Sequence, residues 1–101
     1  MKPIYNYLVL VDYYRAGYAQ QRSTAGRYRV AAKTPEEAEE LVKAVIGFGS
    51  PHVRLRYPMD DPQNLPYKKV MREVFVDVVN GRDVYRLEEA THATAPRNKN
   101  K

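Results

Sequence analysis

Apolar and polar residues follow the period of a β-strand in three segments of the first 57 residues. Residues 4–14, IYNYLVLVDYY, are apolar at almost every position, which predicts a central strand of a sheet. Residues 27–33, RYRVAAK, and 51–57, PHVRLRY, alternate instead, so that each has one apolar face and one face with two arginines. Since successive side chains of a strand point to opposite faces, each alternating segment should have one face in the core.

One helix is predicted between the second and third of these segments. Thr34 followed by Pro35 is a typical helix start, because a threonine side chain can cap free backbone amides and proline suits the first helical position. Glu37, three residues after Thr34, completes a capping box. Across residues 35–47 the apolar positions keep the i, i+3, i+4, i+7 spacing of a single buried stripe. The stripe consists of Ala38, Leu41, Val42 and Val45.

The second half of the chain predicts an irregular connection followed by a hairpin. Residues 58–69 are too rich in proline to form a regular element. Residues 70–79, VMREVFVDVV, have the β-branched content of a strand, and the Asn-Gly pair that follows is a strong hairpin signal, so residues 82–88 should pair back. Residues 70–79 can also be interpreted as a helix, because Val70 and Val74 stand at helical spacing.

These elements predict an α+β fold made of a mainly antiparallel sheet of about five strands, in the chain order β-β-α-β-β-β, with one helix packed on one face. Residues 1–90 should form a single domain, and residues 91–101 a disordered, mobile basic tail. The side chains expected to face the helix are Leu8, Leu10, Tyr28, Val30, Val53 and Leu55. The side chains expected on the opposite, open face are Tyr5, Tyr7, Tyr13, Arg27, Arg29, Arg54 and Arg56.

The composition adds a basic charge and excludes cysteine chemistry. The 101 residues include 17 Lys and Arg against 12 Asp and Glu, for a net charge of +5, and nine tyrosines but no cysteine. Without cysteine there are no disulfides, and a cytoplasmic protein is expected. The apolar run near the start is interrupted by Asp12 and is too short to span a membrane or to resemble a signal peptide, so no membrane association is expected.

Residues that could carry catalysis or bind a metal are scarce. Ser23 and Ser50 lack the context of a catalytic nucleophile, which leaves His52 as the one candidate base in a predicted element. Asp60 and Asp61 lie near other oxygen donors, but their spacing is that of a polar turn and not of a calcium loop. We therefore expect a protein that is not an enzyme and that needs no cofactor or metal.

Arginines and tyrosines suggest a binding surface for single-stranded nucleic acid. Binding a single strand requires cations that follow the phosphates and flat side chains on which bases stack. The open face of the predicted sheet would offer both. The residues that we expect to bind are Tyr5, Tyr7, Arg27, Arg29, Arg54 and Arg56. Secondary contacts are expected from the loop at residues 15–26, through Arg15, Tyr18 and Arg22.

The alternative hypothesis is a small accessory protein that binds and inhibits or regulates a larger protein machine. Tyrosine and arginine are both enriched at protein interfaces. Two tyrosine-bearing loops, residues 15–26 and 57–67, could dock together with the sheet face on an acidic protein surface. The final hairpin could also pair with a second copy through a sheet edge and give a homodimer.

Overall fold

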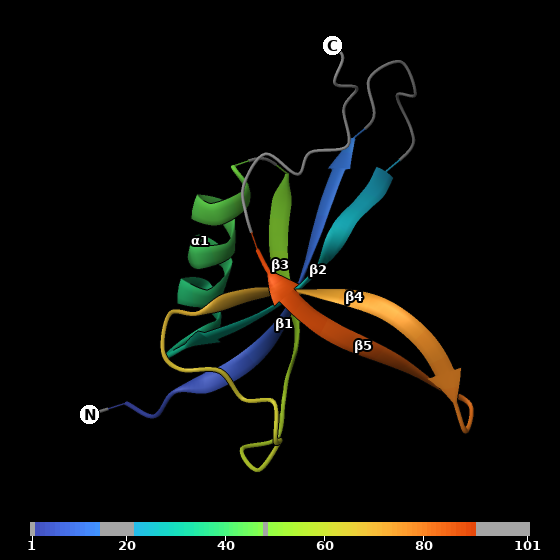
Figure 1. Cartoon of the computed structure of the whole chain (residues 1–101). Helices are drawn as coiled ribbons and strands as arrows, with labels where there is room; N and C mark the ends of the chain where they lie inside the picture. The colour runs from blue at the N-terminus through green and yellow to red at the C-terminus, as the bar shows by residue number, and fades with distance from the viewer. Residues whose placement is uncertain (1, 15–21, 48, 91–101) are drawn as a thin grey trace.

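The described part of the chain folds as one antiparallel sheet with one helix. The computed structural model describes residues 2–14, 22–47 and 49–90, without the side chains of 13–14 and 22–25. Its elements are β1 (Tyr5–Tyr14), β2 (Arg22–Ala32), α1 (Pro35–Ile46), β3 (Ser50–Arg56), β4 (Val70–Val79) and β5 (Arg82–Glu89). The strand order is β3-β1-β2-β4-β5, every neighbouring pair is antiparallel, and α1 lies on one side of the sheet (Figure 1).

This arrangement confirms the predicted α+β class and the order of elements along the chain. Residues 70–79 form a strand, so the helical interpretation of this segment is wrong. The loop predicted at residues 15–26 is too long, because β2 already begins at Arg22. The tail predicted at residues 91–101 lies outside the described residues. Within the described ranges, no helix is long and apolar enough to cross a membrane.

The start of α1 is capped by the predicted residues, except that the Glu37 side chain reaches the backbone of Lys33 and not that of Thr34. The Thr34 hydroxyl accepts a hydrogen bond from the Glu37 backbone N–H at 3.0 Å, and the Glu37 carboxylate accepts one from the Lys33 backbone N–H at 2.8 Å. At the other end, Gly47 adopts a left-handed conformation with φ 76°, which suits glycine because it has no Cβ. Local sequence therefore places both ends of the helix.

The core lies between α1 and one face of β1 and β2. The helix buries Ala38, Val42 and Ile46, with Leu41 and Val45 partly buried beside them. Facing them are side chains from β1 and β2: Tyr7, Val9, Val11, Tyr28, Val30 and Ala32.

The expected orientation of β1 is wrong. Tyr7 pairs across the strands with Val30, which faces the helix, whereas Leu8 pairs with Arg29 on the opposite face. Tyr5 and Tyr7 therefore lie on the helix side, and Leu8 and Leu10 on the other side. The alternation could not distinguish the two because β1 is apolar on both faces.

Folding of the 57–69 connection explains why both faces of β1 are apolar. The Asn6 side chain accepts a hydrogen bond from the Leu65 backbone N–H at 2.8 Å and donates one to the Leu65 carbonyl at 3.4 Å. Asn6 and Leu8 are consequently buried, although they point away from the helix. The 57–69 connection therefore covers the part of the expected open face that β1 forms.

A β-bulge in β3 breaks the regular alternation of PHVRLRY. Leu8 pairs with Leu55 and Val9 with Val53, so Arg54 has no partner residue on β1. The extra residue shifts the phase of the strand. Val53 faces the helix as expected, but Leu55 lies on the opposite face and is 44% exposed. Arg56 lies on the helix side, opposite Tyr7, and not on the expected open face.

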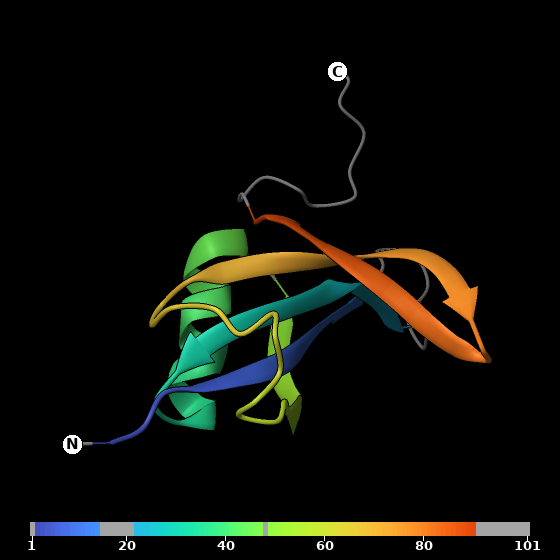
Figure 2. The ribbon, with the colours of Figure 1, turned by 60° about the horizontal axis from the view of Figure 1, so that its bottom comes forward.

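The β4-β5 hairpin extends beyond the rest of the sheet. β4 pairs with β2 only over residues 70–73, so residues 74–86, which we call the arm, project as a two-stranded ribbon (Figures 1 and 2). The turn at its tip consists of Asn80 and Gly81, both with positive φ, as the Asn-Gly signal predicts. A bulge at Val76 lies within the arm.

Candidate functional site

The six residues expected to bind nucleic acid do not form one surface. Tyr7 is only 5% exposed in the core, and burial raises the pKa of its hydroxyl. Tyr5 is half-buried, and the guanidinium of Arg56 lies 4.2 Å from the centre of its ring, on the helix side of the sheet. Arg27 and Arg29 lie on the opposite face, as predicted.

The remaining residues that were expected to bind nucleic acid are also not gathered on one surface. Arg54 is exposed at the β3 bulge, on the strand furthest from β5. Arg15 and Tyr18 lie outside the described residues, and so does the side chain of Arg22. The loop contacts therefore stay predictions.

Arg29 is the centre of a buried charge network on the face opposite the helix. It is 4% exposed, and its guanidinium lies 3.6 Å from the centre of the Tyr57 ring. Its Nη1 is 3.2 Å from Asp61 Oδ1, and its Nε is 3.5 Å from Glu73 Oε2. The side chains come from β2, β4 and the 57–69 connection, so the network ties this connection to the sheet.

Glu73 joins the other members of the network. It is 7% exposed, and its Oε1 lies 3.1 Å from Arg27 Nη2 while its Oε2 accepts a hydrogen bond from the Tyr57 hydroxyl. Burial, together with this bond, raises the pKa of Tyr57 and keeps the phenol neutral. The Gln63 backbone N–H and Arg29 hold the pKa of Asp61 below its usual value.

The network is electrically balanced, with two arginines against two carboxylates. A guanidinium that is buried and paired in this way is not available to contact a phosphate. Arg27 is more accessible, at 32% of its side chain, and lies 4.0 Å from the centre of the Tyr85 ring. Beside these residues is a hollow of about 370 Å³, lined also by Gln63, Asp83, Val84 and Leu87.

The arm exposes apolar side chains that were not expected from the sequence. Five of its apolar side chains are between 39% and 53% exposed: Phe75, Val76, Val78, Val79 and Val84. Because Val78 and Val79 are neighbours on one strand, they place apolar surface on both faces of the ribbon. The run VFV-VV in the sequence is the signal, since a strand that is apolar on both faces must be covered on both faces or leave apolar surface in water.

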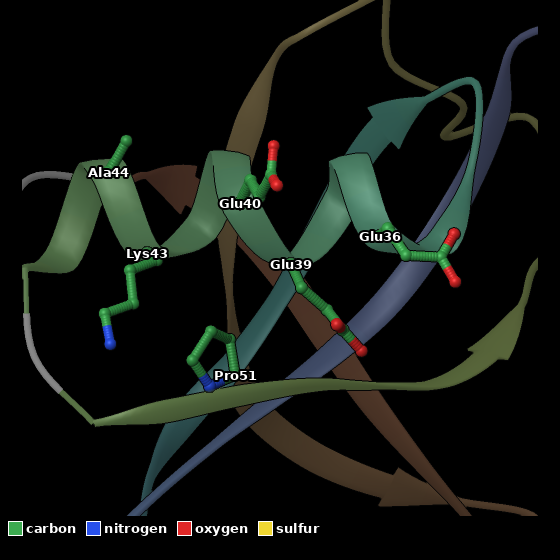
Figure 3. A pocket seen from close by; sticks show the side chains of 6 residues that line it. All are labelled: Glu36, Glu39, Glu40, Lys43, Ala44 and Pro51. Atoms are coloured by element: carbon green, nitrogen blue, oxygen red, sulfur yellow. The ribbon is translucent and has the colours of Figure 1, made fainter.

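A hollow of about 490 Å³ between α1 and β3 is lined by three glutamates of the helix together with Lys43, Ala44 and Pro51 (Figure 3). Glu39 points from the helix to β3, and its Oε2 accepts a hydrogen bond from the Val53 backbone N–H at 3.0 Å. Lys43 Nζ donates to the Gly49 carbonyl at 3.3 Å. The first bond joins the helix to β3, and the second joins it to the residue that precedes β3. Among the described side chains, no group of three or more His, Cys, Asp or Glu is arranged to hold a metal ion.

His52, the candidate base, pairs with a carboxylate. Its Nδ1 lies 3.7 Å from Asp12 Oδ2, and its side chain is 45% exposed. Among the side chains that the structure describes, no hydroxyl is hydrogen-bonded to the imidazole ring. At this distance the two groups are not hydrogen-bonded, so the described side chains do not form a nucleophilic triad around the ring.

The arm and the balanced network are thus the two features from which a function can be argued. No protein-family model, curated protein or solved structure matches the chain.

Proposed function

We propose that the protein is a non-enzymatic binding module that docks on a partner protein through its arm and regulates that partner. One observation carries the proposal: the arm projects from the sheet and exposes five large apolar side chains on its two faces. Exposed apolar surface of this kind is typical of protein interaction sites. The cytoplasm is the proposed location, because the chain has no cysteine.

The apolar side chains of the arm can supply part of the binding free energy. Full burial of a valine or phenylalanine contributes about 1.5–3 kcal/mol, so covering five side chains that are about half exposed contributes roughly 5 kcal/mol. Association itself costs about 4–15 kcal/mol. The arm therefore acts as the anchor of a larger interface, which would extend over Tyr85 and the hollow next to Arg27.

The charges of the arm favour a partner recognised by apolar contact. Asp77 and Asp83 balance Arg82 and Arg86, so the arm has no excess of cations. A nucleic-acid surface would need such an excess. The expected arginines also lie apart, with Arg29 neutralised in the network and Arg56 on the other face. Protein binding is consequently the better supported of the two functions.

A matched pair of variants tests this proposal. Val78→Asp places a carboxylate on the apolar arm, and Ala44→Asp places one on the exposed side of α1. The tagged chain is expressed in the cells that make the protein, and the material bound to each form is purified and quantified relative to the tagged chain. A photo-crosslinking residue at position 78 of the wild-type chain then identifies which bound protein touches the arm.

We expect the wild-type chain and the Ala44→Asp variant to recover one protein in stoichiometric amount. That protein should be crosslinked from position 78, and the Val78→Asp variant should not recover it. Recovery should persist at high salt, because the contact is apolar. Equal recovery by both variants would contradict the proposal. So would recovery of nucleic acid that is released by salt, which would favour the single-strand hypothesis.

A further inference from the structure

β5 is an edge strand of the sheet formed by the described residues, with a neighbouring strand, β4, on one side. At the other edge, Glu39 of α1 accepts a hydrogen bond from the Val53 backbone N–H, so a backbone group of β3 that a further strand would need is already bonded. A helix against an edge strand disfavours strand pairing there. In the part of the chain that the structure describes, no strand or helix pairs with the outer side of β5 (Figure 2).

The charges along β5 match those of a second β5 that runs antiparallel to it. In such a pair, the numbers of two residues that face each other across the contact always add up to the same sum. That sum must be even, because paired residues must both direct their backbone groups toward the partner or both away from it. A sum of 170 puts Arg82 of each copy opposite Glu88 of the other, with Tyr85 opposite its own counterpart at the two-fold axis. No like charges then face each other.

The neighbouring registers are disfavoured by charge or by length. A shift of two residues in one direction places Arg82 opposite Arg86 of the second copy. A shift in the other direction places Asp83 opposite Glu89, and Arg86 opposite its own counterpart. Like charges directly opposite each other destabilise a strand pair. A further shift pairs Arg86 with Glu88 but joins only residues 85–89 of the strand, instead of residues 82–88.

We propose that two copies of the chain associate through β5 in the register that pairs Arg82 with Glu88. The sheet then continues from one copy into the other, and the contact is isologous, as a two-fold dimer requires. The two arms lie side by side, so their exposed apolar side chains form one larger surface. The pairing uses the backbone edge and two charged residues, and does not depend on what the faces of the arm bind.

Single charge reversals and their mixture test this register. Sedimentation velocity of the full chain over a range of concentrations should show a species of twice the 11.7 kDa chain mass. Arg82→Glu places two glutamates opposite each other, and Glu88→Arg places two arginines opposite each other. Each should raise the dimer Kd by about tenfold or more, because two attractive pairs become repulsive. Arg82 is exposed, whereas Glu88 is half-buried and also pairs with Arg86 of its own strand, so circular dichroism checks that each variant keeps the fold.

An equimolar mixture of the two variants should form a heterodimer with the wild-type Kd. In that pair the two introduced side chains, which have opposite charges, face each other in one contact, and the unchanged Arg82 and Glu88 face each other in the other. Arg54→Glu, a reversal on the opposite edge strand, is the matched control and should leave the dimer intact. The proposal is overturned if the wild-type chain is monomeric at its highest soluble concentration. It is also overturned if the single reversals dimerise like the wild type, or if the mixture associates no better than either variant alone.

Discussion

Replacing Arg29 with alanine tests whether the charge network holds this arginine in the fold. Breaking a buried ion pair costs about 3–5 kcal/mol, because the remaining charge has lost its partner. Here Glu73 keeps Arg27 and the Tyr57 hydroxyl, and the Asp61 side chain is 22% exposed. We therefore expect the free energy of unfolding to fall by an amount near the lower end of this range, about 3 kcal/mol. This is a large part of the roughly 5–15 kcal/mol that stabilises a domain.

Urea unfolding followed by circular dichroism at neutral pH measures the loss. Arg54→Ala is the matched control, since Arg54 was expected on the same surface but is exposed, and its replacement should change stability by less than about 0.5 kcal/mol. The double variant Arg29→Ala/Glu73→Ala should be destabilised by about 1 kcal/mol less than the summed destabilisation of the two single variants. The reason is that neither charge of the pair is left buried without the other.

Equal and small losses for Arg29→Ala and Arg54→Ala would refute this reasoning. Arg29 would then not depend on its carboxylate partners and could serve as a binding cation. The nucleic-acid hypothesis, which requires a free arginine on this face, would regain its support.

The core and the alkaline stability give two further predictions. Val42→Ala should lower the free energy of unfolding by about 2 kcal/mol, and by more than Leu41→Ala, because Val42 is fully buried and Leu41 only partly; a larger loss at Leu41 would contradict the packing described for α1. Tyr57 has a raised pKa in the folded state, so its contribution is complete below the ordinary pKa of 10.0 and is lost as the pH rises above it. Tyr57→Phe should therefore lose stability less steeply above about pH 10 in urea titrations, and an unchanged slope would be evidence against the buried phenol.

The sequence by itself determined the order of the elements and the type of most of them, because these depend on neighbouring residues, whereas residues 70–79 were open to both a strand and a helix interpretation. The Thr34-Pro35 start and the Asn-Gly turn each act within a few residues, and both are found where they were predicted. Alternation also placed Arg27 and Arg29 away from the helix correctly, because Tyr28 and Val30 are the apolar residues of that strand.

Only the tertiary structure decided which side chains meet. In β1 both faces are apolar, so local pattern cannot say which one the helix covers and which one the 57–69 connection covers. In β3 the bulge at Arg54 changes the faces of the residues after it, and a bulge depends on pairing with β1.

At the candidate site, the partners of Arg29 were likewise decided by the tertiary structure and not by local sequence. Asp61 and Glu73 are 32 and 44 residues away in the chain, and pairing of β2 with β4 brings Glu73 beside it. The exposure of the arm likewise follows from where that pairing stops. Local sequence sets the conformation of each segment, whereas burial and charge neutralisation depend on contacts between segments that are distant in sequence.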